Sequence, residues 1–311
     1  MGQKRRRPLR ESKASKGPRT DDSHVESSSS KMNVEHSSDE SGSESDGDIV
    51  LDGEMGSEQL SMTFEFNDMQ DEYGDGVAKM LSFLLPHSQA RELGEFVACQ
   101  GEVGTAVVCE EGDDVFAYAT VVPLPKLQSS CEPMGRLLGE VLGAVSGLGS
   151  RCEGAEELIS CVSSTRSSQT GVYLHGRYLN LPLQLVEPLH QNLYDDIKWA
   201  ASGSTTTTNE STDTADADVA VPSGEFASIS MLLMIVECSL ADAQQIKQGS
   251  CVSVTGSSSL VFSNFEDDIF FEEAVCAVLM RPTMSSKQVC VMLIPLASMP
   301  GCISKIGSLV Q

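Results

Sequence analysis

The sequence predicts an α/β fold in which a mixed, mostly antiparallel sheet is flanked by helices and preceded by a disordered N-terminal tail. Three observations lead to this prediction. The 311-residue chain changes near residue 60 from a polar, charged composition to an apolar, patterned one. Beyond that point, some segments have apolar residues at every second position, and others have them at spacings of three and four. The two kinds of segment are interspersed, which favours a single layered domain over residues 61–311.

Residues 1–60 combine a basic head with an acidic continuation. Residues 1–20 contain eight basic residues and one acid, whereas residues 21–75 contain seventeen acids and one cation. Such a segment cannot bury enough apolar surface to offset the entropy of folding, so we predict that residues 1–60 are disordered. The head is typical of a nuclear or nucleolar localisation signal, and a non-specific basic tail is the alternative. The signal residues are Lys4, Arg5, Arg6 and Arg7.

The first part of the domain is expected to contain a strand, two helices and a β-hairpin. Met62–Phe66 alternates as a strand, and apolar residues recur at helical spacing over residues 75–85, where Pro86 ends the helix. A second helix is expected from Ser88, as its N-cap, to Gln100. Residues 104–109 and 115–122 are short, mostly apolar segments on either side of an acidic, Gly-containing turn, which predicts a β-hairpin.

A glycine-rich helix is expected over residues 133–150. Gly135, Gly139, Gly143 and Gly147 recur every four residues on an otherwise helical apolar pattern. Each glycine costs about 1 kcal/mol relative to alanine inside a helix, so their alignment calls for a cause. We expect close packing of this glycine face against a sheet, and a weak or frayed helix is the alternative.

The remaining elements follow the same two periodicities. Residues 202–224 are rich in Ser, Thr, Asp and Gly and predict a low-complexity insertion. The expected elements are a helix over 155–162, a strand over 170–174, a helix over 183–199, strands over 226–238 and 289–295, and a final helix over 298–310.

An acidic and aromatic stretch over residues 263–274 is the candidate functional segment. It concentrates five carboxylates beside three phenylalanines and leads into an apolar run. The carboxylates must stay in water or meet a cation, because an unpaired buried carboxylate is very costly. We therefore predict an acidic surface that binds a basic partner, and a solvated acidic face without a partner is the alternative. The expected partner-binding residues are Phe265, Glu266, Asp267, Asp268, Glu272 and Glu273.

The composition limits the class of partner. The chain has 45 acidic and 21 basic residues and a formal net charge of −24, which argues against nucleic acid and favours basic proteins. Ten cysteines stand singly, with no C-x-x-C pair and no close Cys/His cluster, so we expect free thiols in the core and no metal site. The longest apolar runs are far shorter than the ~20 residues of a membrane-spanning helix.

The motifs of common enzyme classes are missing from the sequence. There is no P-loop, no H-E-x-x-H and no G-x-S-x-G. His190, with Asp195 nearby on the same helix, is interpreted as a surface pair, and His175 suggests no specific chemistry. Two segments approach the acetyl-coenzyme-A loop pattern [QR]-x-x-G-x-[GA], beginning at Arg136 and Arg151, but both depart from it at the last position. We expect neither catalysis nor a cofactor.

Five segments resemble, in order, those of the BCCIP family. The most specific are Gly176-Arg-Tyr-Leu-Asn-Leu-Pro182 and Val291-Met-Leu-Ile-Pro295. The others are Met62–Phe66 with the following Tyr73–Val77, Asp114–Tyr118, and the acidic-aromatic stretch over 264–273. The resemblance covers residues 62–310. It implies a GNAT-like domain over 61–311 that lacks acetyl-coenzyme-A binding and carries the insertion at 202–224.

The resemblance also implies a function without enzymatic activity. It indicates a nuclear chaperone and export adaptor for a basic ribosomal protein of the large (60S) subunit, in ribosome biogenesis, with nuclear transport factors as further partners. A regulatory scaffold in cell-cycle control and DNA repair is the alternative. The expected location is the nucleus or nucleolus, with shuttling to the cytoplasm. We expect a monomer that binds neither nucleic acid nor membrane directly.

Overall fold

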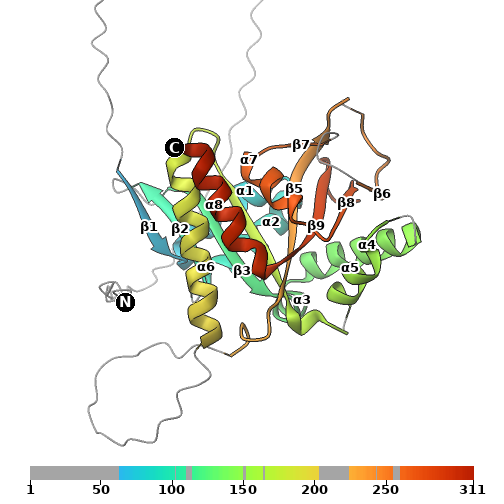
Figure 1. Ribbon diagram of the computed structural model, residues 1–311, viewed down its shortest axis with the longest axis horizontal. Coiled ribbons are helices and arrows are strands. Elements are labelled where there is room, and N and C mark those ends of the chain that lie inside the picture. The colour runs from blue at the N-terminus through green and yellow to red at the C-terminus, as the bar shows by residue number, and fades with distance from the viewer. Residues whose placement is uncertain are drawn as a thin grey trace, which may run out of the picture. The chain divides into compact units, whose positions relative to one another are not determined.

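The computed structural model describes the patterned part of the chain (Figure 1). The predicted tail, its basic head Lys4–Arg7 and nearly all of the insertion at 202–224 lie outside the described residues. The described residues are 63–101, 103–109, 114–149, 152–163, 165–202, 224–242, 244–254 and 260–311.

Nine strands of the described residues form one sheet in the order β1-β2-β3-β4-β5-β9-β8-β6, with β7 paired to β5. Among the described strands, β4 and β5 run parallel and every other pair is antiparallel. The mixed, mostly antiparallel sheet is therefore confirmed. The strands are β1 Phe64–Asp68, β2 Gly104–Cys109, β3 Val115–Pro123, β4 Thr170–Arg177, β5 Met231–Leu240, β6 Cys251–Ser253, β7 Leu260–Phe262, β8 Cys276–Met280 and β9 Val289–Pro295.

Helices cover both faces of this sheet. The helices α1–α5 pack on one face of the sheet and share one apolar core with it. The helices α6, α7 and α8 pack on the other face and form a second core. Figure 1 shows α6 and α8 crossing the sheet side by side, in agreement with their contacts. The helices are α1 Gly74–Leu81, α2 His87–Ala98, α3 Leu124–Ser130, α4 Glu132–Leu148, α5 Ala155–Val162, α6 Val186–Ser202, α7 Phe265–Glu272 and α8 Met299–Val310.

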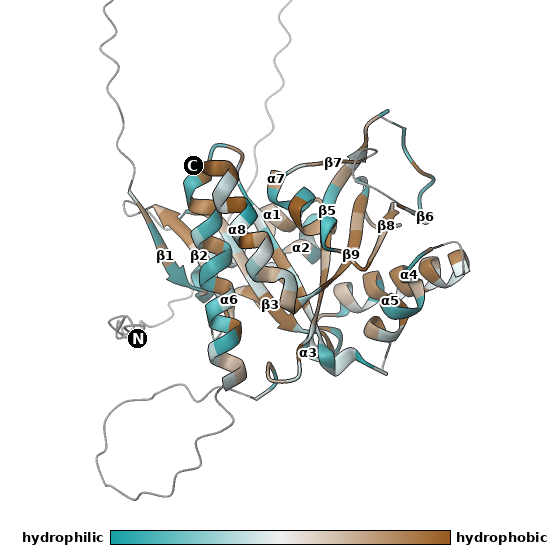
Figure 2. Ribbon diagram, viewed as in Figure 1, coloured by the Kyte–Doolittle hydropathy of each residue, from teal (hydrophilic) through white to brown (hydrophobic). Residues whose placement is uncertain are grey.

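The central strands are apolar on both faces because each face meets a helical layer. Along β5, Met231, Leu233 and Ile235 enter the first core, and the residues between them enter the second. The same alternation holds along β9. Figure 2 accordingly shows β8 and β9 coloured as hydrophobic, whereas α6 carries both colours. Side chains of successive strand residues point to opposite faces, so a strand covered on both sides has to be apolar throughout.

The parallel strands β4 and β5 separate after a short common stretch. Their register runs from Thr170 opposite Met231 to Tyr173 opposite Met234 and stops there. Beyond this point β4 continues to Arg177 beside β3, and β5 continues to Leu240 beside β9 and β7. The sheet is thus interrupted between the second halves of these two strands, and side chains from α1 and α7 approach the interruption.

Most predicted elements are confirmed, with shifts at their ends. The hairpin, the helix over 155–162 and the strand over 289–295 lie where the sequence places them. The predicted N-cap Ser88 is wrong, because Pro86 occupies the cap and Ser88 is already inside α2. The strand expected over 226–238 begins five residues later, at Met231, and the helix expected from Leu183 begins with a 3₁₀ turn.

The predicted packing of the glycine face of α4 is wrong. Gly139, Gly143 and Gly147 are exposed, and a Cβ built on any of them would meet no atom within 4 Å beyond its own helix and neighbours. The buried face of α4 instead carries Leu137, Leu138, Val141 and Val145. Large apolar side chains gain more from burial than glycines do, so they select the face that meets the sheet.

The cysteines of the described residues are all free, and eight of the ten are buried. Their prediction as small core residues is therefore confirmed for those eight; Cys99 is exposed and Cys251 is half-buried. Among the described helices, none combines the length and the apolar character needed to span a membrane.

Candidate functional site

Helix α7 carries most of the acidic stretch, and it divides the predicted partner-binding residues between two environments. Three acids follow one another in its first turn, where the helix dipole favours negative charge. Glu266 and Asp267 are buried, each 1% exposed, whereas Asp268 is exposed. We call Glu266 and Asp267 the inner acids. We call Asp268, Glu272 and Glu273 the outer acids.

Strand β4 supplies the partners of the inner acids. Tyr173, His175 and Arg177 stand at every second position of β4, so they share the face that meets α6 and α7. Arg177 donates from Nε to Oε1 of Glu266 at 2.8 Å and from Nη2 to Oε2 at 3.1 Å. Both side chains are nearly buried, at 5% and 1% exposure, and this forked geometry is the strongest form of an arginine–carboxylate pair. The guanidinium also lies over the Phe265 ring, 5.6 Å from its centroid.

His175 and Asp267 form the second buried pair. His175 Nε2 lies 2.9 Å from Asp267 Oδ1, and both side chains are at most 3% exposed. The approach is not aligned for a hydrogen bond, and neither atom has another hydrogen-bond partner among the described residues. The other carboxylate oxygen, Oδ2, accepts a hydrogen bond of 3.3 Å from Asn264 Nδ2. The contact between His175 and Asp267 is therefore an ion pair when His175 carries a proton.

His190 of α6 completes the cluster from the opposite helix. Its Nδ1 is hydrogen-bonded to the hydroxyl of Tyr173, while its Nε2 is buried without a hydrogen-bond partner among the described residues. The rings of His190, Tyr173 and His175 also pack against Phe270 of α7 with centroid separations of 5.3 to 6.3 Å. Edge-to-face packing of this kind adds to the energy of area burial. The interpretation of His190 as a surface pair is therefore wrong.

The surroundings shift the pKa values of His175 and His190 in opposite directions. Burial opposes the charged form of His175, but attraction by Asp267 and then Glu266 outweighs burial and Arg177 and raises its pKa. Burial lowers the pKa of His190 well below its usual value, and repulsion by His175 and Arg177 adds to this effect. Near neutral pH the cluster therefore holds a proton more readily on His175 than on His190.

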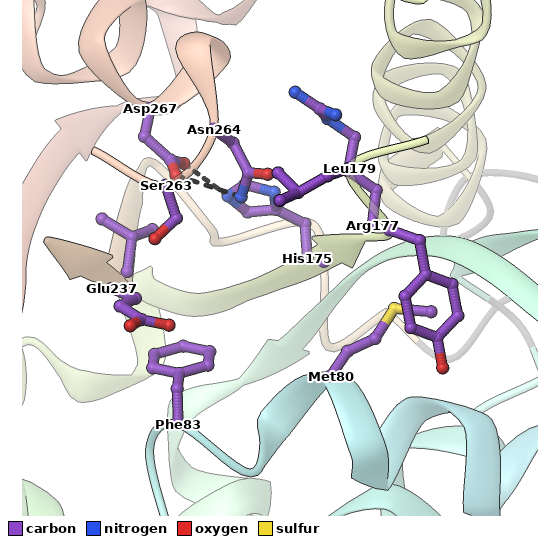
Figure 3. A pocket seen from close by; sticks show the side chains of 12 residues that line it. Met80, Phe83, His175, Arg177, Leu179, Glu237, Ser263, Asn264 and Asp267 are labelled. Carbon is purple, nitrogen blue, oxygen red and sulfur yellow. Dashed lines mark hydrogen bonds and ion pairs between the residues drawn. The ribbon is translucent and has the colours of Figure 1, made fainter. Parts of the chain in front are cut away.

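A pocket of about 250 Å³ opens beside the His175–Asp267 pair, where β4 and β5 separate (Figure 3). We call it the His175–Asp267 pocket. Its walls come from α1, from β4 and the loop after it, from β5, and from the segment that leads into α7. Its lining residues are Met80, Phe83, His175, Gly176, Arg177, Tyr178, Leu179, Val236, Glu237, Ser263, Asn264 and Asp267.

Two of the outer acids, Asp268 and Glu272, border a second hollow, of about 480 Å³, between α7 and α8. Its apolar surface comes from Phe265, Ile269 and Leu309, and its acidic edge includes Asp268 and Glu272. Lys305 of α8 contacts Glu272 at 3.2 Å and Glu273 at 2.8 Å. Burial and then repulsion by Glu272 raise the pKa of Asp268. We call this hollow the α7–α8 groove. It combines exposed apolar area with one more acid than cations, since Asp268 and Glu272 line it against Lys305.

The cluster is poorly suited to a metal ion. His175, His190 and Glu266 each have a potential ligand atom, all within 4.8 Å of one another. Tetrahedral zinc with bonds of ~2.1 Å needs its donor atoms only ~3.4 Å apart. Both oxygens of Glu266 already accept hydrogen bonds from Arg177, whose positive charge would lie beside the ion. The expected absence of a metal site stays a prediction.

The two segments that approach the acetyl-coenzyme-A loop pattern are also unsuited to pyrophosphate. Arg136 and Gly139 lie inside α4, where backbone N–H groups are taken up by the helix. Gly154 precedes α5, whose first turn carries Glu156 and Glu157 and would repel a phosphate. These positions therefore lack the free N–H groups or the favourable charge that a phosphate site needs.

Comparison with known proteins decides the family. The family model described as BCCIP matches residues 59–270. The chain belongs to the BCCIP family. It is 25% identical over 232 residues to the BCCIP homolog of Xenopus laevis, and the match covers 70% of this chain and 67% of that protein. It is 23% identical over 222 residues to protein bcp1 of Schizosaccharomyces pombe, with coverage of 70% and 73%.

Two further similarities extend the range of organisms. The BCCIP homolog of Arabidopsis thaliana is 29% identical over 152 residues, and this match covers 48% of the chain and about half, 45%, of the Arabidopsis protein. The crystal structure of BCP1 from Saccharomyces cerevisiae is similar with a TM-score of 0.49 and 13% identity, covering 81% of this chain and 92% of that chain. The resemblance read from the sequence is thus confirmed as BCCIP membership. The GNAT-like label stays a prediction.

Membership of the BCCIP family does not explain why the acids divide, but the pattern of β4 does. The expectation that all five carboxylates form one surface is wrong for Glu266 and Asp267, because both lie on the buried side of α7 that faces β4. The sequence contains a signal for this outcome that was missed. Polar residues at 173, 175 and 177 share one face of a strand in a sheet that is covered on both faces, so buried counter-charges are needed there.

Proposed function

We propose that this BCCIP-family chain is a nuclear acidic binding protein that chaperones a basic ribosomal protein of the large subunit. In this role it shields the basic surface of the client before ribosome assembly and acts as an adaptor in its export. Three features support the proposal: the family, the net charge of −24, and an exposed acidic groove with apolar area. The α7–α8 groove is the single observation that carries it.

The groove supplies both kinds of contact that a basic client needs. Exposed ion pairs contribute only ~0.2–1 kcal/mol each, so charge alone sets the encounter rate more than the affinity. The apolar area of the groove can add affinity, because Leu309 is 68% exposed and stands beside Phe265 and Ile269. Lys305 does not neutralise the groove, since it pairs with Glu272 and Glu273, and Asp268 forms no ion pair with a described residue.

Capture of the client from nuclear extract tests the proposal. The full-length tagged chain is expected to retain one basic large-subunit ribosomal protein at a 1:1 ratio, with binding that weakens as salt rises. The test variant is Asp268→Asn with Glu272→Gln, which removes two charges from the groove. The matched control is Glu92→Gln with Glu156→Gln, which removes two exposed charges from α2 and α5.

The groove variant is expected to retain several-fold less client, whereas the control retains as much as the unaltered chain. Equal capture by both variants would remove the groove from the proposal. Capture of cell-cycle or repair proteins without any basic ribosomal protein would contradict the chaperone role itself.

Location and chemistry complete the proposal. We place the chain in the nucleus, with shuttling to the cytoplasm, because of its basic head; replacing Lys4, Arg5, Arg6 and Arg7 with alanine is expected to shift a fluorescent fusion to the cytoplasm. An unchanged distribution would contradict this assignment.

We further propose a monomer without catalytic activity and without direct binding to nucleic acid, and calorimetry with acetyl-coenzyme A is expected to show no heat of binding.

A further inference from the structure

The His175–Asp267 pocket lies where the sheet is interrupted, and charged side chains form its floor. His175 stands on β4 and Val236 and Glu237 stand on β5, beyond the last pair of residues that joins these strands. Figure 3 shows Asp267 and His175 facing one another beside the hollow, with Met80 and Phe83 on the opposite side. The volume of about 250 Å³ is below the ~300–1,000 Å³ of typical small-molecule sites, so it suits a single side chain.

The polar atoms at the floor lack good partners. Asp267 and His175 both line the pocket. Asp267 Oδ1 and His175 Nε2 lie 2.9 Å from one another, but this approach is not aligned for a hydrogen bond and neither atom has another partner among the described residues. Buried polar atoms in native proteins almost always have a partner, so such atoms at a pocket indicate a ligand. The remaining acceptors around them are the second oxygen of Asp267, the carbonyl oxygen of the Asn264 side chain and the hydroxyl of Ser263.

The charge balance of the lining depends on whether His175 carries a proton. Arg177 is neutralised by the forked pair with Glu266, and Glu237 is paired with Lys287 at 2.8 Å. Asp267 faces His175, which compensates the carboxylate when it carries a proton. When His175 is neutral, the pocket therefore carries the charge of Asp267. A cation supplied from outside would replace the proton of His175 as the counter-charge.

The walls of the pocket match the stem of a long basic side chain. Met80, Phe83 and Val236 are apolar, and the entrance carries Tyr178 and Leu179, which are 40% and 79% exposed. Basic side chains bury their methylene groups along apolar surface while their charged end meets polar groups. Several acceptors at one floor favour the five N–H donors of a guanidinium over the three of an ammonium.

We propose that the His175–Asp267 pocket receives one arginine side chain of the basic partner, with the guanidinium at Asp267. The source of this arginine rests on the proposed function, but the pocket can be tested without the client. Arginine binding and protonation of His175 compete for Asp267. Binding is therefore expected to strengthen as pH rises and His175 loses its proton. The charged and titratable groups facing His175 are Asp267 and Glu266 of α7, Tyr173 and Arg177 of β4, and His190 of α6.

The probe is N-acetyl-arginine amide, titrated into the isotopically labelled full chain and followed by NMR. The signal of the His175 imidazole, assigned by its loss in a His175→Gln variant, is expected to shift saturably. Its pKa is expected to fall in the presence of the probe, because the guanidinium repels the imidazolium. N-acetyl-citrulline amide has nearly the same shape without the charge, and it is expected to bind at least about tenfold more weakly. N-acetyl-lysine amide tests the preference for a guanidinium.

Two variants locate the binding. Asp267→Asn keeps the shape of the carboxylate and is expected to weaken binding at least about tenfold. Asp195→Asn removes an exposed carboxylate of α6, outside both the pocket and the α7–α8 groove, and is expected to leave binding unchanged. Thermal unfolding confirms that the variants fold. If Asp267→Asn does not fold, the comparison of the arginine probe with the citrulline probe in the unaltered chain tests whether binding depends on the charge of the guanidinium.

Equal binding of citrulline and arginine, or binding that survives in folded Asp267→Asn, would overturn the proposal. Tighter binding of the lysine probe would replace the guanidinium by an ammonium and overturn the choice of arginine. These outcomes are independent of client capture. Failure at the pocket leaves the α7–α8 groove and its client untouched, and failure of client capture leaves the response of His175 to arginine.

Discussion

Glu266 and Asp267 lie on the inner side of α7, whereas Asp268 and Glu272 lie on its outer side, within a single short helix. The inner acids meet Arg177 and His175 in a nearly water-free environment, and the outer acids meet water and Lys305. The same chemical group therefore has two roles. Inner acids hold α7 against β4, and each depends on its partner. Outer acids cost little to change and are free to face another molecule.

The largest expected effect comes from separating the inner pair. Glu266→Ala leaves the guanidinium of Arg177 buried at 5% exposure without a counter-charge, so we expect a loss of ~3–5 kcal/mol in the free energy of unfolding. Urea denaturation measures the change. Asp268→Ala is the matched control on the outer side, with an expected change within about 0.5 kcal/mol. Similar losses for the two variants would remove the distinction between inner and outer acids.

Removing both members of the inner pair sharpens this result. Replacing Arg177 with Met and Glu266 with Leu together exchanges a buried ion pair for apolar side chains of similar size. Such exchanges are often neutral, so we expect the double variant to recover most of the stability lost in Glu266→Ala. A double variant as unstable as the single variant would mean that the pair contributes by itself, and not only through the cost of leaving one charge alone.

An intermediate effect is expected from the two buried histidines, which change the stability with pH in opposite directions. The raised pKa of His175 means that the folded chain binds its proton more tightly, so its contribution to stability is full below the unfolded pKa of ~6.5 and is lost as pH rises above it. The lowered pKa of His190 means that the unfolded chain gains the proton first, so stability is lost as pH falls below ~6.5.

Urea denaturation over pH, for the unaltered chain, His175→Gln and His190→Gln, measures these two contributions. The difference between the unaltered chain and His175→Gln is expected to shrink with rising pH, and the difference for His190→Gln is expected to shrink with falling pH. His87→Gln changes an exposed histidine and serves as the control. Differences that change with pH in the same direction for both buried histidines would contradict the opposite pKa shifts.

The smallest effect is expected on the outer side. Lys305→Gln removes the contacts to Glu272 and Glu273, both of which remain in water. We expect a slight loss of stability at low salt that disappears at high salt, because exposed ion pairs are weak and screened. The same variant makes the groove more acidic, so capture of a basic client is expected to increase. A loss of stability that persists at high salt would place this pair with the inner acids.

Much of the layered architecture could be predicted from local patterns. Short apolar runs over Val115–Pro123 and Val289–Pro295 indicate buried strands, and the spacing of Leu189, Leu193 and Ile197 indicates the buried face of α6. These patterns are local because a strand or helix exposes its faces at a fixed period. The glycines of α4 show the limit of this approach. Their spacing defines a face, but the competition between faces for the sheet decides which one is buried.

The sequence by itself determined the acidic balance, the segment in which the acids concentrate, the alternation of Tyr173, His175 and Arg177, and the family resemblance. Only the tertiary structure decided which acids are buried. Arg177 and Glu266 are 89 positions apart, and they meet because β4 and β5 separate and α7 closes over the end of β4. No local period contains that information, since the energy of a buried charge depends on a partner that the folded chain brings from elsewhere.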